Sequence, residues 1–251
     1  MKHLTILTGA SRGMGFALAG QLCNADAVLL CISRTETLSL NQLAATRGAA
    51  LTQWTADLAD CAPIAQRVQD WLSAQASKQV GSATLINNAG LTGRMGPLDP
   101  IDAATLAMTM RVDLEAPMLL CAAFLTATRG WSVPRKILNI SSGLGRRAMA
   151  GGAMYCAAKA GMDHFSRCVA LDEAQQTNGA RIVSLAPGII DTDMQADLRA
   201  ADPVRFPGRE GFIDFKEKGA LTAPAEAAAR VLAYLAQPDF GDPSVADLRE
   251  P

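Results

Sequence analysis

Three side chains, Ser142, Tyr155 and Lys159, have the types and spacing of an acid–base site. Tyr155 and Lys159 are four residues apart in a run, residues 154–171, whose apolar residues recur at helical spacing. An ammonium group about 4 Å from a phenol favours the phenolate by about 4 kcal/mol at an effective dielectric constant of about 20. We therefore expect Lys159 to lower the pKa of Tyr155 toward neutrality. Such a tyrosine exchanges a proton at working pH, as carbonyl reduction and alcohol oxidation require.

The Tyr155 and Lys159 pair alone is weak support for catalysis, because an amphipathic surface helix often carries two such residues four positions apart. Whether the pair is catalytic therefore depends on the strands and helices that position it. Apolar strand-like runs alternate with helical runs along the chain. Strands are expected at residues 4–8, 27–32, 51–54, 84–87, 136–140 and 181–186, and helices at 13–23, 35–46, 63–76, 103–128 and 154–171.

This alternation predicts an α/β fold: a single doubly wound, Rossmann-type domain over residues 1–251, with a mostly parallel sheet flanked by helices on both faces. Pro117 is expected to break the 103–128 helix and to start a new one in its first turn. Residues 193–221 are rich in proline and glycine, and we interpret them as a substrate-binding lid within the domain.

The first strand is followed by T-G-x-x-x-G-x-G at residues 8–15, which opens a helix. Glycines there allow the backbone to approach a pyrophosphate, which the free amide groups and the helix dipole bind. In its strand–turn–helix context the motif strongly predicts a dinucleotide site. The expected contacts are Gly9, Ser11, Arg12, Gly13, Met14 and Gly15.

The second strand ends in Ser33 and Arg34, where an NAD enzyme would place a carboxylate for the adenosine ribose. A guanidinium binds a 2′-phosphate instead, so Arg34 and Arg12 favour NADP(H). The alternative is that both arginines are solvated surface charges. Asp57 and Leu58 end the third strand and are expected at the adenine edge, although an aspartate there also suits a helix cap.

The composition limits which binding partners and which cellular compartment are expected. The 251 residues carry a net charge of −1 and no long basic run, so neither nucleic acid nor a membrane surface is expected as a partner. The apolar run at the N-terminus is too short for a signal peptide, and the chain is expected to be cytoplasmic. Six scattered cysteines and two distant histidines favour neither a metal site nor disulfides.

Together these motifs resemble the short-chain dehydrogenase/reductase family over nearly the whole chain, with N-N-A-G at residues 87–90 and P-G-x-x-x-T at 187–192. The resemblance implies that Tyr155 is the general acid/base, that Lys159 tunes it and holds the nicotinamide ribose, and that Ser142 hydrogen-bonds the substrate carbonyl. It places Asn88, Ala89 and Gly90 on the adenosine side, and Asn87 in a sheet-stabilising role. Its further cofactor contacts are Pro187, Gly188, Ile190, Thr192 and Met194.

One position departs from the family pattern. The family usually has asparagine in a V-N-L segment, which completes a catalytic tetrad through a bound water, whereas this chain reads Val112-Asp113-Leu114. If the backbone carbonyl holds that water, Asp113 preserves the contact and changes a side-chain hydrogen bond. We expect activity to survive and the extra carboxylate to shift its pH dependence.

The C-terminal segments are similar to those of sepiapterin reductases and bacterial benzil reductase-like proteins. In sepiapterin reductases a carboxylate of the final strand anchors the pterin, and Asp247 matches it by position, although a carboxylate near a chain end is more often solvated. In the loop 144–154, Met149 and Met154 suit an aryl or alkyl ketone. Arg146 and Arg147 in this loop are equally compatible with a position in solvent.

The sequence therefore predicts an NADPH-dependent reductase of an aldehyde, ketone or diketone, with a pterin side chain or an aryl diketone as the leading substrate. A 3-oxoacyl thioester reductase and a catalytically silent NADP-binding sensor or scaffold are the alternatives. The same residues also serve alcohol oxidation. Residues 103–128 resemble the helices that form the family's dimer interface, so a homodimer is expected, and its association into a tetramer stays open.

Overall fold

The centre of the fold is a seven-stranded sheet in which all paired neighbours are parallel. The computed structural model describes residues 1–75 and 77–250. The strands follow the order β3-β2-β1-β4-β5-β6-β7. The chain adds β2 and β3 on one side of β1 and then β4 to β7 on the other, so the strand order reverses between β1 and β4. They are β1 (Lys2–Thr8), β2 (Ala27–Ser33), β3 (Ala50–Thr55), β4 (Val80–Asn87), β5 (Arg135–Ile140), β6 (Arg181–Ala186) and β7 (Val245–Asp247). The predicted doubly wound α/β fold is confirmed.

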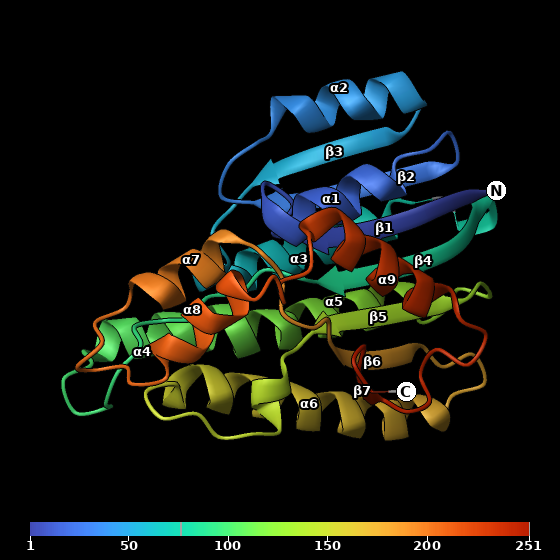
Figure 1. Cartoon of the computed structure of the whole chain (residues 1–251). Helices are drawn as coiled ribbons and strands as arrows, with labels where there is room; N and C mark the ends of the chain where they lie inside the picture. The colour runs from blue at the N-terminus through green and yellow to red at the C-terminus, as the bar shows by residue number, and fades with distance from the viewer. Residues whose placement is uncertain (76, 251) are drawn as a thin grey trace.

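Helices cover both faces of this sheet (Figure 1). One core packs α1 (Gly13–Leu22), α2 (Leu38–Arg47) and α9 (Pro224–Ala236) against the sheet. The other core lies beneath α3 (Cys61–Ser73), α5 (Ala116–Thr128) and α6 (Ala153–Ala174). Within β2, Leu29 and Cys31 belong to the first core, and Leu30 and Ile32 to the second. Because both faces are covered, the strand is apolar without alternation.

Several boundaries differ from those expected. The helix expected at 35–46 begins at Leu38, because the side chain of Gln53 hydrogen-bonds the backbone of Thr37 and holds it extended. The helix expected at 63–76 ends at Ser73, and Ala76 lies outside the described residues.

The interruption expected near Pro117 is a π turn and not a break in the helical backbone. A π turn, η3 (Arg111–Glu115), joins α4 (Ala103–Met110) to α5, and the backbone is helical at both junctions. Pro117 does lie in the first turn of α5, where its missing N–H costs least. The wider turn that precedes it carries Asp113, which is fully buried. The irregularity that the sequence suggested is therefore a π turn inside one helical segment.

The segment 193–221 contains two short helices, α7 (Asp193–Ala200) and α8 (Arg209–Glu217), which project beyond the carboxyl ends of the strands (Figure 1). Between them Phe206 is fully buried and packs 5.7 Å from the ring centre of Phe212. The function of the segment 193–221 as a substrate-binding lid stays a prediction. Among the described helices, none combines the length and the apolar character needed to cross a membrane.

Candidate active site

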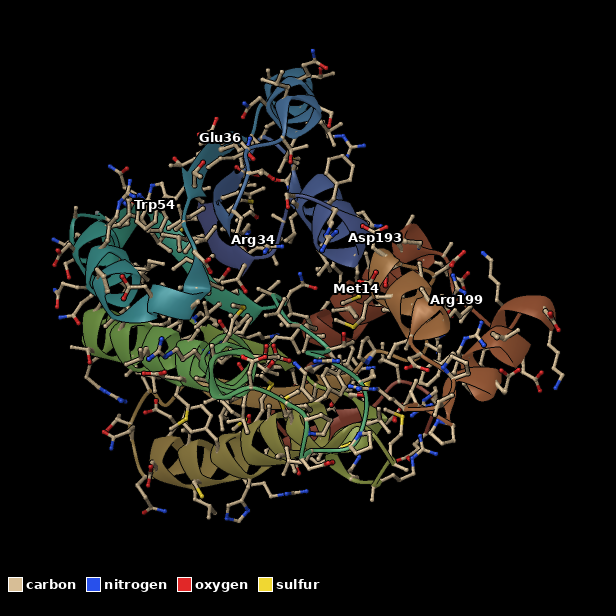
Figure 2. The ribbon with its side chains drawn as sticks, turned by 90° about the vertical axis from the view of Figure 1, so that its left-hand side faces the viewer. Met14, Arg34, Glu36, Trp54, Asp193 and Arg199 are labelled. Carbon is tan, nitrogen blue, oxygen red and sulfur yellow. The ribbon has the colours of Figure 1, made fainter. Side chains whose placement is uncertain are left out.

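A cavity of about 960 Å³ lies at the carboxyl ends of the strands, where the strand order reverses. This is where parallel sheets of this type bind ligands, and the volume suits a small organic ligand. Every residue that the sequence predicted to contact a cofactor lines this cavity, as do Ser142 and Met149, whereas Asp113 and Asp247 do not. Figure 2 looks onto this edge, where Met14 lies on α1, Arg34 follows β2 and Asp193 begins α7.

The glycine turn after β1 forms a cradle that a side chain would fill. A Cβ at Gly15 would lie 2.0 Å from the carbonyl oxygen of Gly9, and Gly9 itself has φ +71°. Asn88 donates its side-chain amide to the carbonyls of Thr8 (3.0 Å) and Gly9 (3.2 Å), which ties the end of β4 to the turn. A pyrophosphate fits here, because the turn brings backbone close to the N-terminus of α1.

The end of the cavity predicted to hold the adenosine has a buried polar group without a hydrogen-bond partner among the described residues. This group is the hydroxyl oxygen of Ser33, and Arg34 beside it is exposed. Arg12 pairs with Asp193 at 2.9 Å, but both side chains are about two-thirds exposed, so opening this pair costs little. Asp57 lines the cavity and also caps a short helix, accepting from the amide of Ala59 at 2.9 Å. These groups suit a phosphorylated ribose.

The side chains predicted to be catalytic lie together, as the helical spacing predicted. Helix α6 places Tyr155 and Lys159 one turn apart, both buried, with the Lys159 ammonium 5.5 Å from the centre of the Tyr155 ring. Ser142 lies near the Tyr155 phenol, close enough to lower its pKa, and its hydroxyl accepts a hydrogen bond from the amide of Leu144 at 3.2 Å. Lys159 also donates to the carbonyl of Ile140 at 3.1 Å. A phenol, a hydroxyl and an ammonium therefore line one end of the cavity.

The expected lowering of the Tyr155 pKa is wrong for the chain alone. Burial raises the pKa of this phenol, and the nearby Asp113 carboxylate raises it further, although Lys159 and Ser142 oppose them. The spacing of Tyr155 and Lys159 indicates the effect of the ammonium, but neither the loss of solvent nor the second charge. A raised pKa keeps Tyr155 protonated at neutral pH, as a proton donor must be.

Asp113 forms a buried ion pair with Lys159. Its Oδ1 accepts from the amide of Leu91 at 2.7 Å, and its Oδ2 lies 3.5 Å from the Lys159 ammonium. Burial raises the pKa of Asp113, with Lys159 acting against it. Burial alone would lower the pKa of Lys159, but Asp113 and Tyr155 outweigh it and the pKa is raised. The departure from asparagine thus gives the lysine a counter-charge.

Asp163 is not among the site residues predicted from the sequence, yet its carboxylate connects the segments that carry Ser142 and Tyr155. It lies one turn after Lys159 on α6 and accepts hydrogen bonds from the hydroxyls of Ser141 (2.6 Å) and Ser184 (2.7 Å). Ser141 immediately precedes Ser142, so this carboxylate fixes the end of β5 to the helix that carries Tyr155. The only signal in the sequence is its spacing of four residues from Lys159.

The substrate end differs from expectation. The carboxylate of Asp247 is 1% exposed, and it binds Arg249 at 2.6 Å and Arg146 at 3.2 Å. The hydrogen bond from Arg249 lowers the pKa of Asp247. Direct anchoring of a substrate by Asp247 would require these ion pairs to open. Arg146 is not a free solvent-facing charge, because it also lies 3.7 Å from Asp163, and Arg147 and Arg249 line the cavity.

The parallel sheet with a glycine cradle at its switch point defines the class of α/β proteins that bind dinucleotides. Residues 3–203 match the model of the short chain dehydrogenase family, and the chain belongs to this family, whose members bind nicotinamide cofactors.

Two relatives and one solved structure place the chain within the family. It is 34% identical to a benzil reductase ((S)-benzoin forming) of Bacillus cereus over 94% of each chain. It is 32% identical to the sepiapterin reductase of Xenopus tropicalis over 92% of this chain and 90% of the relative. A metagenomic short-chain oxidoreductase solved in complex with NADP superposes with a TM-score of 0.72 at 26% identity, covering 98% of this chain and 94% of that one. The predicted family and branch are confirmed.

Proposed function

We propose that the protein reduces the carbonyl group of an aldehyde, ketone or diketone to an alcohol with NADPH. The observation that carries the proposal is the buried Tyr155 phenol beside Lys159, which lines one cavity together with Ser142 and with every predicted cofactor contact. A proton donor beside a hydroxyl donor is what carbonyl reduction needs from the protein.

The chain's own residues supply the proton and the orientation. A bound reduced nicotinamide supplies hydride to the carbonyl carbon. Tyr155 transfers its phenolic proton to the carbonyl oxygen, so hydride and proton together give the alcohol. Ser142 donates a hydrogen bond to the same oxygen and stabilises the charge that develops there. Lys159, held by Asp113 and the Ile140 carbonyl, stabilises the tyrosinate that remains.

The preference for NADPH is part of the proposal and is tested at Arg34. A charged hydrogen bond contributes about 1.5–3 kcal/mol, and a carboxylate in its place repels a 2′-phosphate. Arg34→Asp should therefore lower the ratio of kcat/KM for NADPH to that for NADH about a hundredfold. The matched control is Arg167→Asp on the exposed side of α6, which should keep the wild-type ratio. An unchanged ratio in Arg34→Asp would contradict a 2′-phosphate contact.

Apolar side chains support a substrate with an aryl or alkyl body. Met95, Met149, Phe212 and Phe215 line the cavity together with Tyr155. Aryl diketones and pterin side-chain ketones come first as test substrates, because relatives named for benzil and sepiapterin reduction match over nearly their whole length. A 3-oxoacyl thioester reductase is the alternative enzyme, and a silent NADP-binding sensor or scaffold is the alternative without catalysis.

A second copy of the chain is the proposed partner. Leu106 on α4 and Met118 on α5 are large apolar side chains that stay exposed. Exposed apolar side chains on these helices support a homodimer in which a second copy would cover them.

The experiment that tests the function is a steady-state assay of cofactor oxidation by the purified protein. Benzil, sepiapterin, an aryl aldehyde and an acetoacetyl thioester are each offered with NADPH and with NADH. We expect turnover of an aryl diketone or of sepiapterin with NADPH. Turnover of the thioester alone would establish the alternative enzyme. Tight NADPH binding without turnover of any substrate would favour the sensor.

A further inference from the structure

We propose that Arg147 and Arg249 form an anion-binding subsite at the substrate end of the cavity. The preferred substrates are then aryl carbonyl compounds that carry a carboxylate across the ring from the reacting group. The inference rests on the proposed function for the identity of the reacting group, while the anion subsite itself rests on the geometry and charge of the arginines.

Both guanidinium groups lie against the backbone that follows Ser142. A Cβ at Gly143 would be 2.6 Å from Nη2 of Arg249 and 2.9 Å from Nη2 of Arg147. Gly143 therefore leaves room for two arginines that any side chain would displace. Since Gly143 follows Ser142 directly, with consecutive Cα atoms about 3.8 Å apart, both guanidinium groups lie on the same wall of the cavity as Ser142.

These arginines differ in their pairing with carboxylates. Arg249 binds the Asp247 carboxylate through two nitrogens at 2.6 and 2.9 Å, and Arg146 bridges Asp247 and Asp163. Arg146 and Arg249 thus share these two carboxylates, and the charge of Glu250 also acts on Arg249. Arg147 forms no ion pair or side-chain hydrogen bond with any residue that the structure describes. The guanidinium of Arg147 is exposed at the cavity wall and is therefore available to a ligand.

The chemistry of the wall selects the ligand. A guanidinium presents parallel donors that match a carboxylate in two hydrogen bonds, and such charged pairs are stronger than neutral ones. The cavity is also lined by apolar residues on either side of Arg147 in the sequence, namely Leu144, Ala148 and Met149. An aromatic ring suits these apolar neighbours, and its para-carboxylate can reach Arg147 while its aldehyde or ketone lies at Tyr155.

The first test compares 4-formylbenzoate with its methyl ester as substrates. The ester is the more electrophilic aldehyde, so the informative quantity is the ratio of kcat/KM for acid over ester, compared between variants. Arg147→Gln should lower this ratio about tenfold, the loss of about one charged hydrogen bond. Added salt should lower the wild-type ratio as well. Arg167→Gln, which removes an exposed arginine outside the cavity, should leave the ratio at its wild-type value.

The second test needs no turnover. Calorimetry compares the binding of 4-(hydroxymethyl)benzoate and its methyl ester to the wild type and to Arg147→Gln, each saturated with NADP. Tighter binding of the acid by the wild type alone supports the subsite, even if neither aldehyde is reduced and the proposed function fails. Equal acid-to-ester preference in wild type and Arg147→Gln, in binding or in kcat/KM, would overturn the subsite whether or not the protein is a reductase.

Discussion

Tyr155→Phe should lose about a thousandfold in kcat for carbonyl reduction while it still binds NADPH. The phenol is the proton donor in the proposed reaction, and phenylalanine has no proton to give. The substitution keeps the aromatic packing of a side chain that is 9% exposed, and Lys159 keeps its counter-charge from Asp113. Single-turnover oxidation of NADPH, with cofactor binding measured by calorimetry, separates the chemical step from binding.

The chain provides a matched control, because its second tyrosine lies far from the reacting groups. Tyr234 is on α9, packs edge-on against Phe240 at 6.0 Å and does not line the cavity. Tyr234→Phe should reduce carbonyl compounds at the wild-type rate. If Tyr155→Phe also retained full turnover, the assignment of Tyr155 as the acid would be wrong. A joint loss of turnover and NADPH binding would indicate damage to the site instead.

The fold follows from the sequence because both faces of the sheet are buried. Strands such as Ala27–Ser33 are continuous apolar runs, and that pattern with intervening helices permits few arrangements other than a covered parallel sheet. The segment 103–128 was harder to interpret. Pro117 signals an irregularity, but whether a proline breaks a helix or follows a π turn depends on tertiary packing, here the burial of Asp113.

The cofactor cradle and the Tyr155 and Lys159 pair are local features, so spacing along the chain predicts them. Contacts between residues that the sheet brings together from distant parts of the chain are harder to predict from the sequence. Asp163 accepts hydrogen bonds from a hydroxyl just after β5 and from one in β6, and Arg249 reaches the cavity from beyond the end of β7. Neither contact has a local spacing signature. The direction of the Tyr155 pKa was also missed, because burial and Asp113 enter only in three dimensions.

Asp113→Leu should lower the free energy of unfolding by about 3 kcal/mol. Asp113 and Lys159 are 0% and 4% exposed at their side chains, and the leucine would leave the ammonium buried without its carboxylate. Asp113→Asn should cost less, because its amide oxygen can still accept from the Leu91 amide. Urea unfolding should give free energies of unfolding that decrease from the wild type to Asp113→Asn to Asp113→Leu. The control for loss of a carboxylate is Asp172→Asn on the exposed side of α6.

The asparagine variant also tests how the carboxylate acts on catalysis. The charge of Asp113 raises the pKa of Tyr155, so removing it lowers that pKa. Reduction requires the protonated phenol, and its rate falls as pH rises through the Tyr155 pKa. The alkaline limb of the pH–rate profile should therefore move to lower pH in Asp113→Asn, whereas a stability defect alone would lower the rate without moving the limb. Superimposable profiles would show that the carboxylate does not influence the proton donor, and that its role is limited to holding Lys159.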